Sequence, residues 1–213
     1  MEIERKFNQW NSGLFISLEG IEGSGKTTQI NKIRDYYSHQ GRVVTILREP
    51  GGTNFGESIR DVILKSKEAV TPIAEALLFA SSRAQLIIQE IIPRLNNNEV
   101  VILDRYIHSS IAYQGFGRAL KPETILSLHQ YSPLNLIPNF TFYLKISIDT
   151  SIERQDKRGN EKDYFEKEDF NFYKKLLDGF DYCSKRFPQS FFQINAELSE
   201  QEVSKEILKV LEN

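Results

Sequence analysis

A stretch of eight residues near the N-terminus constrains the fold of this 213-residue chain more than any other feature. It reads GIEGSGKT, from Gly20 to Thr27, and fits the pattern G-x-x-x-x-G-K-[ST]. The apolar residues 14–18 before it are typical of a buried strand, and a helical pattern follows it to about residue 40. Because a chance glycine turn seldom lies between such a strand and helix, the stretch predicts a loop that surrounds a nucleoside triphosphate.

The residue types of this loop suit a polyphosphate. Glycines allow successive backbone N–H groups to surround a phosphate, and the start of the helix adds its dipole. Lys26 would place a charge on the outer phosphates, and the Thr27 hydroxyl would reach a Mg²⁺ ion. The predicted ATP-binding residues are Gly20, Ile21, Glu22, Gly23, Ser24, Gly25, Lys26 and Thr27.

Composition excludes several classes of protein. With 40% hydrophobic and 26% charged residues the chain should be globular, and a net charge of −2 gives no support to a nucleic acid partner. The lone cysteine, Cys183, cannot form an internal disulfide, so we expect a cytoplasmic protein with Cys183 packed in a helix. No apolar run reaches membrane-spanning length. Residues 1–13 are expected to be a short extension and not a signal peptide, ahead of one domain over residues 14–213.

Strand-like and helix-like segments alternate along the chain. The predicted strands are residues 14–18, 42–47, 99–104, 140–146 and 191–194. The predicted helices after the first are residues 55–64, 72–95, 121–131, 149–157, 166–184 and 199–211. This alternation predicts an α/β fold in which helices cover both faces of a parallel sheet, because the strand runs are nearly all apolar.

The residues around Asp104 narrow the function. The chain lacks the N-K-x-D motif with which a GTPase recognises its base, and Arg105 follows Asp104 where a mechanical ATPase usually has a glutamate. An arginine there suits a second anion beside the triphosphate, which points to transfer between two phosphate-bearing molecules. Asp104 ends a buried strand, so a Mg²⁺ ion or a basic partner is favoured over a helix cap. His108 is expected at the surface.

Two further stretches have both a functional and a plain interpretation. Phe79 and Arg83 are four residues apart on one helix face, where a ring and a guanidinium could stack on a nucleobase and bond its edge. Spacing alone favours an ordinary amphipathic helix, with Phe79 in the core and Arg83 at the surface. Residues 48–53, REPGGT, suit a binding loop but would suit any turn.

These motifs in order make the chain similar to the thymidylate kinase family. The motifs are EGIEGSGKTT, REPGGT, the pair Phe79 and Arg83, and DRY-x-x-S-x-x-AYQG from Asp104. The resemblance implies the three-layer fold of phosphate-loop NTPases, with a five-stranded parallel sheet flanked by helices, a mobile lid and usually a homodimer. It also implies transfer of the γ-phosphoryl group of ATP to dTMP, giving dTDP for dTTP synthesis, with Mg²⁺.

The resemblance further implies roles around dTMP. Phe79 would stack on thymine and Arg83 would bond its edge, while Tyr113 would crowd the 2′ position of the sugar. Arg105 and Arg60 would hold the dTMP phosphate. Further contacts are expected from Gln114, from Ser109 or Ser110, from Glu22 near the 3′-hydroxyl, and from Glu49 and Arg48. Thr27 and Asp104 would hold the metal.

A charged stretch matches the lid of the family, at about residues 151–168. Arg154 and Arg158 are four apart and would share a helix face, and the phosphate loop has no arginine among residues 21–24. The resemblance implies that Lys26, Arg105, Arg154 and Arg158 act in catalysis. Asp156 replaces a lid arginine common in relatives, and Glu166 matches a lid-flanking acid. The competing interpretation of this charged stretch is a solvated helix end.

The chain departs from the family pattern at residues 138–141, PNFT, at Lys145, and at residues 131–133, YSP. Two other functions stay open on the residues alone. A deoxynucleoside kinase would phosphorylate a nucleoside, against which Arg48, Arg60 and Arg105 argue as a set of phosphate ligands. A catalytically silent nucleotide-binding module is disfavoured by the presence of Lys26 and Asp104.

Overall fold

Five parallel strands form one sheet, with the order β2-β3-β1-β4-β5, in the computed structural model. The structure describes residues 13–66, 68–159, 164–165 and 168–212. The strands are β1 (Leu14–Glu19), β2 (Val44–Arg48), β3 (Val100–Asp104), β4 (Phe140–Lys145) and β5 (Phe191–Asn195). The five predicted strands are confirmed, and every neighbouring pair runs parallel.

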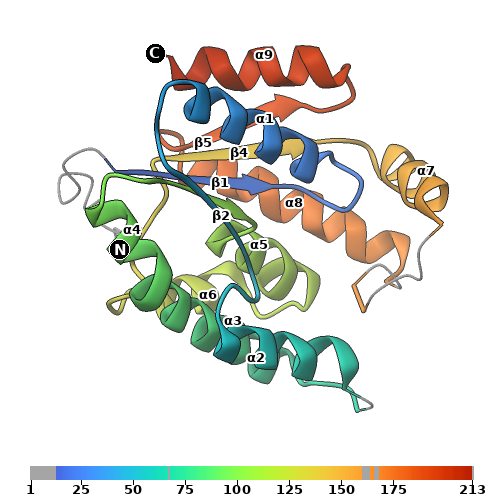
Figure 1. The fold of residues 1–213 in the computed structure, drawn as a ribbon. Coiled ribbons are helices and arrows are strands. Elements are labelled where there is room, and N and C mark those ends of the chain that lie inside the picture. Colours follow the sequence, from blue (N-terminus) through green and yellow to red (C-terminus); the bar gives the residue numbers. More distant parts are fainter. Residues whose placement is uncertain (1–12, 67, 160–163, 166–167, 213) are drawn as a thin grey trace.

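Helices cover both faces of this sheet, which confirms the three-layer α/β prediction (Figure 1). The α-helices are α1 (Lys26–His39), α2 (Asn54–Lys65), α3 (Pro72–Leu86), α4 (Ile92–Asn96), α5 (Ile107–Ser110), α6 (Pro122–Leu128), α7 (Ile148–Arg158), α8 (Phe170–Arg186) and α9 (Glu200–Leu211). Two π-helical segments are η1 (Ile87–Ile91) and η2 (Ile111–Gly117). Helices α1 and α9 lie together on one face, and α5 and α8 lie on the other (Figure 1).

The carboxyl ends of three strands meet at one edge of the sheet. In the strand register Leu18 pairs with Asp104, and Arg48 pairs with Asp104 from the other side. The loops that follow β1, β2 and β3 therefore begin side by side. Because parallel sheets bind ligands beyond their carboxyl ends, this register brings the glycine-rich loop, REPGGT and DRY to one site.

Two helical segments differ from the predicted ones. The helix expected over residues 72–95 is interrupted by η1, just before Pro93, which lacks an N–H and whose ring would clash with the carbonyl four residues earlier. Residues 107–117, for which no helix was predicted, form α5 and η2. All residues from Ile107 to Gly115 are buried, so this stretch has no amphipathic period that would reveal a helix.

The surface position expected for His108 is wrong. Its side chain is fully buried, and its ring packs edge-on against Phe187 and lies 5.1 Å from Phe191, because α5 faces the layer between the sheet and α8. Cys183 is buried in α8, as expected. Residues 1–12 lie outside the described residues, so the predicted N-terminal extension is untested. Within the described ranges, no helix is both long and apolar enough to cross a membrane.

Candidate active site

The loop between β1 and α1 closes around its own lysine. Gly23 and Gly25 have positive φ angles of 78° and 92°, a backbone region that other residues seldom adopt. Lys26 is buried, and its Nζ donates to the carbonyl oxygens of Gly20 at 3.1 Å and Ile21 at 3.3 Å. Burial lowers the pKa of Lys26. The loop, with Lys26 and Thr27, lines a cavity of about 710 Å³, here called the loop cavity.

Arg105 stands at the carboxyl end of β3, in a left-handed backbone conformation with φ 70°. Its guanidinium forms an ion pair with Glu22 and donates to the Gly20 carbonyl at 2.9 Å and the Ser109 hydroxyl at 3.3 Å. The charge of Lys26, with that of Arg105, lowers the pKa of Glu22 to about 2 against the effect of burial. Glu22 is therefore ionised at neutral pH and orients Arg105.

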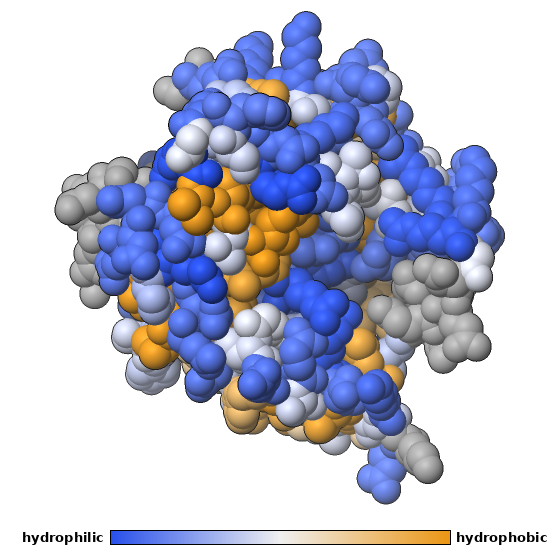
Figure 2. All heavy atoms as spheres, in the orientation of Figure 1, coloured by the Kyte–Doolittle hydropathy of each residue, from blue (hydrophilic) through white to orange (hydrophobic). Residues whose placement is uncertain are grey.

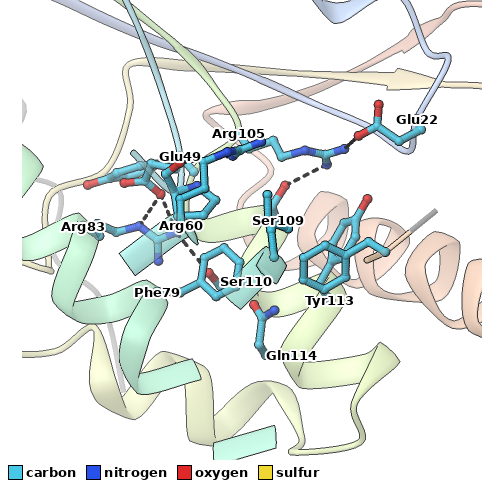
Figure 3. Close-up of a pocket in the computed structure, with 14 residues that line it drawn as sticks. Glu22, Glu49, Arg60, Phe79, Arg83, Arg105, Ser109, Ser110, Tyr113 and Gln114 are labelled. Atoms are coloured by element: carbon cyan, nitrogen blue, oxygen red, sulfur yellow. Dashed lines mark hydrogen bonds and ion pairs between the residues drawn. The ribbon is translucent and has the colours of Figure 1, made fainter. Parts of the chain in front are cut away.

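A second cavity, here called the aromatic cavity, has a volume of about 570 Å³, part of it open to solvent (Figure 3). It is lined by every residue that the resemblance implied for binding dTMP except Arg48. These residues are Glu49, Arg60, Phe79, Arg83, Arg105, Ser109, Tyr113 and Gln114, with Ser110 and Glu22. They come from α2, α3, α5 and η2 and from the loops that follow β1, β2 and β3, so only the fold brings them together.

The surface position that spacing favoured for Arg83 is wrong, since its side chain is 1% exposed. Its Nε and Nη2 lie 2.7 Å and 2.5 Å from Glu49 Oε2 (Figure 3). Nη2 also donates to the Ser110 hydroxyl at 3.0 Å, and Nη1 lies 2.6 Å from His129 Nε2. Burial raises the pKa of Glu49 to about 7, opposed by Arg83. Of the five guanidinium N–H groups, these contacts with described residues leave one on Nη1 for a ligand.

His129, to which no sequence pattern points, holds the Arg83 guanidinium on the Nη1 side. A guanidinium can only donate, so His129 Nε2 must accept, and the proton lies on Nδ1, 2.8 Å from the Ile125 carbonyl. Burial, and then the charge of Arg83, lower the pKa of His129 to about 3. His129 is therefore neutral and buried in the core beside the aromatic cavity.

Two further residues near the cavity, Phe165 and Glu19, carry no local signal in the sequence. Phe165 lines the cavity, with its ring centroid 5.3 Å from that of Tyr113 and 6.3 Å from that of Phe79. Glu19, fully buried at the end of β1, accepts from the Tyr106 backbone N–H at 2.8 Å and the Ser109 hydroxyl at 2.5 Å. Phe165 is distant in sequence from Phe79 and Tyr113, whose rings it contacts, so no local sequence pattern indicates it.

Thr27 and Asp104 both face the loop cavity. Asp104 Oδ1 is buried, and no described side chain or backbone group hydrogen-bonds to it. An orphaned carboxylate oxygen beside a hydroxyl fits a hard cation such as Mg²⁺. Among the described residues no group of three or more His, Cys, Asp or Glu side chains is placed to hold a metal ion.

The two arginines of α7 have different surroundings. Arg154 donates to the backbone carbonyls of Gly23 at 3.1 Å and Ala196 at 3.2 Å. Arg158 is half exposed, lines the loop cavity and has a nitrogen 3.9 Å from Glu22 Oε2. Residues 160–163 and 166–167, including Glu166, lie outside the described residues. The predicted lid over residues 151–168 therefore remains untested.

The remaining predicted phosphate ligands also reach the loop cavity. Arg60 lines both cavities and donates to the Pro50 carbonyl at 3.1 Å. Arg48 lines the loop cavity but is exposed and paired with Glu57 at 2.9 Å. This pairing makes Arg48 the more peripheral of the two arginines.

Comparison with known proteins agrees with this geometry. The sequence model described as "Thymidylate kinase" matches residues 18–207. The thymidylate kinase of Thermoanaerobacter sp. strain X514 is 39% identical over 199 residues, which is 93% of this chain and 97% of that protein. The thymidylate kinase of Mycoplasmopsis pulmonis is 37% identical, covering 100% of this chain and 94% of that protein.

A solved structure shows the same fold. The crystal structure of thymidylate kinase from Ehrlichia chaffeensis superposes with a TM-score of 0.74 at 30% identity, covering 95% of this chain and 99% of that one. The phosphate loop, the sheet and the residues of the aromatic cavity thus occur together in a chain that matches these proteins along nearly its whole length. The chain belongs to the thymidylate kinase family, whose members phosphorylate dTMP to dTDP with ATP.

Proposed function

We propose that ATP binds in the loop cavity, that dTMP binds in the aromatic cavity, and that the γ-phosphoryl group passes between them where the cavities meet. The observation that carries this proposal is that the two cavities are adjacent and share lining residues, here called the shared wall. Four residues, Glu22, Glu49, Arg60 and Arg105, line both cavities. A monophosphate whose base lies among Phe79 and Gln114 would place its phosphate at this wall, beside the outer phosphates of ATP.

On the acceptor side, the half-buried Phe79 ring would stack on thymine, and the remaining N–H of Arg83 would bond the base edge. Tyr113, whose ring lies 5.1 Å from the Arg105 guanidinium carbon, would exclude a 2′-hydroxyl. Arg105 and Arg60 would hold the phosphate, since a guanidinium can offer two parallel hydrogen bonds to one phosphate group.

On the donor side, Lys26 and the first N–H groups of α1 would stabilise the charge of the outer phosphates. Thr27 and Asp104 would hold Mg²⁺, which when bound neutralises charge on the phosphate oxygens. Arg158 would meet the charge that spreads over the transferring group, while Arg154 keeps α7 against the phosphate loop.

The main alternative is a deoxynucleoside kinase. Besides Arg158, three arginines line the loop cavity, namely Arg48, Arg60 and Arg105. Two of these three, Arg60 and Arg105, also line the aromatic cavity. A nucleoside brings no charge for these groups, so a monophosphate acceptor accounts for them better. A catalytically silent nucleotide-binding module would not require the buried Lys26 or the Asp104 oxygen that lacks a hydrogen-bond partner, so both residues argue against that alternative.

The test is an ADP-release assay over a panel of nucleosides and monophosphates, with ATP and Mg²⁺. We expect dTMP to be the preferred acceptor and chelation of the metal to stop turnover. Phosphorylation of thymidine with no turnover of dTMP would establish the nucleoside kinase instead. ATP binding with no turnover of any acceptor would support the silent module.

The proposal extends to assembly and location. Exposed apolar side chains gather on α2, α3 and η1, namely Phe55, Val62, Ile73, Leu77 and Ile88. Figure 2 shows apolar residues along the lower edge of this face, where Figure 1 draws α2 and α3. A second copy would cover this patch in a homodimer. The buried, unpaired Cys183 suits a cytoplasmic protein with one domain over residues 14–213.

A further inference from the structure

Two buried side-chain oxygens of residues that line the aromatic cavity, Gln114 Oε1 and Glu49 Oε1, have no partner in the described part of the chain. Gln114 is 1% exposed and lines the cavity, and its Oε1 accepts no hydrogen bond there. Figure 3 shows its amide end directed toward the side chains that line the cavity. A buried amide oxygen without a partner is costly, so a ligand donor is expected to complete it.

The other end of this amide is held by a carboxylate outside the cavity. Gln114 Nε2 donates to Glu75 Oε1 at 2.8 Å, and Glu75, on α3, is fully buried. An ionised carboxylate can only accept, so it binds the NH₂ end of the amide and not the oxygen end. Glu75 thereby determines which end of Gln114 faces the cavity.

Arg118 holds Glu75 from the opposite side. Its Nε lies 3.4 Å from Glu75 Oε2, and its Nη1 donates to Glu168 at 2.6 Å. Its guanidinium also lies over the rings of Tyr164, Phe165 and Phe172, at 5.0 to 5.7 Å. Burial raises the pKa of Glu75, while the Gln114 hydrogen bond and the charge of Arg118 oppose that effect. Arg118 therefore favours the ionised form that the amide requires.

We propose that Glu75 is a specificity-determining positioning residue, which fixes the Gln114 amide so that the aromatic cavity presents an acceptor to the base. Thymine and uracil carry an N3–H donor, whereas N3 of cytosine is an acceptor. The fixed oxygen of Gln114 would accept the N3–H of thymine and repel the cytosine N3. This inference rests on the proposed binding of dTMP in the same cavity.

The variant Glu75→Gln tests this directly. Because Arg118 can only donate, it would attract the oxygen of the new amide and turn its NH₂ group toward Gln114. Gln114 would then rotate to accept with Oε1 and would present its own NH₂ to the base. The cavity would oppose a donor to the N3–H of thymine and would match cytosine.

We expect kcat/KM for dTMP and for dUMP to fall together by about 10- to 100-fold, the effect of unpaired buried hydrogen-bonding groups. Turnover of dCMP should be unchanged or rise, and KM for ATP should be unchanged. A wild-type chain that does not phosphorylate dTMP would refute the proposed function before any variant is compared. A Glu75→Gln variant with the wild-type ratio of dTMP to dCMP would overturn only the inference.

Two further variants separate positioning from general damage. Glu168→Gln removes a charge from the same arginine without touching Gln114, so its dTMP to dCMP ratio should equal that of the wild type. The exchange Glu75→Gln with Gln114→Glu keeps the net charge and returns an acceptor to the cavity, so it should restore the ratio. This double variant also tests the proposal if the single variant does not fold, and loss of discrimination in the folded double variant would overturn it.

Discussion

Arg154 Nη1 donates a hydrogen bond to the backbone carbonyl of Gly23, 3.1 Å away, so this arginine of α7 is joined to the phosphate loop itself. Its other nitrogen bonds Ala196, beyond β5. Arg158, one helical turn later, is half exposed and faces the loop cavity. The two arginines, which share a helix face, are therefore expected to differ in role.

We predict that Arg158→Ala lowers kcat on the order of 10²- to 10³-fold with little change in KM for ATP, as for an arginine that contacts the transferring phosphoryl group. Steady-state kinetics measure both constants. Lys157→Ala is the matched control, because Lys157 is exposed and pairs with Glu153 on the same helix. Near-normal turnover of Arg158→Ala would instead support a solvated helix end.

Arg154→Ala should lower stability as well as turnover, because two carbonyls lose their donor. Each kcal/mol lost should lower the melting temperature by about 2–4 °C in a chain of this size. Calorimetry on the two single variants separates the roles, and an unchanged melting temperature for Arg154→Ala would exclude the anchoring role.

Lys26→Ala should reduce kcat by roughly 10²-fold or more and leave the fold intact, since the charge acts on the phosphates and its burial opposes ionisation. Kinetics and a thermal melt measure the two effects. Lys32→Ala, also on α1, is the control, because its ammonium bonds the Glu200 carbonyl and not the loop. Turnover of Lys26→Ala close to that of the control would contradict the role given to Lys26.

Tyr113→Ala should relax the discrimination between dTMP and its ribonucleotide counterpart, because the buried ring would no longer fill the space beside the sugar. The ratio of kcat/KM for the two acceptors measures this. Tyr113→Phe keeps the ring and should keep the ratio. If both variants behave alike, the tyrosine ring is not a steric barrier.

Stability should depend on pH through His129. Its folded pKa of about 3 lies below its ordinary value of 6.5, so the unfolded chain binds a proton first as the pH falls. The neutral ring stabilises the fold fully above pH 6.5, and about 1.4 kcal/mol is lost per pH unit below it, down to the folded pKa.

His129→Gln keeps an acceptor for Arg83 but has no titrating group. Between pH 6.5 and pH 5 the wild type should lose about 2 kcal/mol more than this variant in denaturant titrations. Glu49, with its raised pKa, contributes the opposite slope above pH 4.5, but it is present in both proteins and leaves the difference to His129. Parallel curves for the two proteins would show that His129 does not titrate as inferred.

Leu77→Glu should convert the proposed homodimer to a monomer, because it places a charge in the apolar patch on α2, α3 and η1. Analytical ultracentrifugation gives the assembly state. Val43→Glu, at an exposed apolar residue before β2, should leave the assembly unchanged. A wild-type chain that sediments as a monomer would reject the dimer.

Local patterns were sufficient for the strands and for the phosphate loop. The run at residues 99–104 predicted β3 (Val100–Asp104), because a strand buried on both faces is apolar throughout. Gly20 to Thr27 are adjacent in sequence, so one motif identifies the whole loop. These features depend on neighbours along the chain, which a sequence displays directly.

The aromatic cavity depends on neighbours in space, and there sequence patterns failed. Arg83 looked like a surface residue, because helical spacing does not reveal that Glu49 and His129 surround it. Only the family resemblance placed it beside a base. Likewise η2 is buried on every side, so no period pointed to the helix that holds Tyr113 and Gln114.

The left-handed backbone at Arg105 is strained, yet the side chain at that position is needed at the candidate active site. A residue other than glycine with φ 70° costs of order 1–3 kcal/mol, and glycine would relieve that strain. Glycine would also remove the guanidinium that Glu22 orients at the wall between the cavities. Glycine at position 105 would therefore exchange a strained backbone for a Glu22 carboxylate without its ion-pair partner, so the chain cannot lose this strain without also losing the contact between its two cavities.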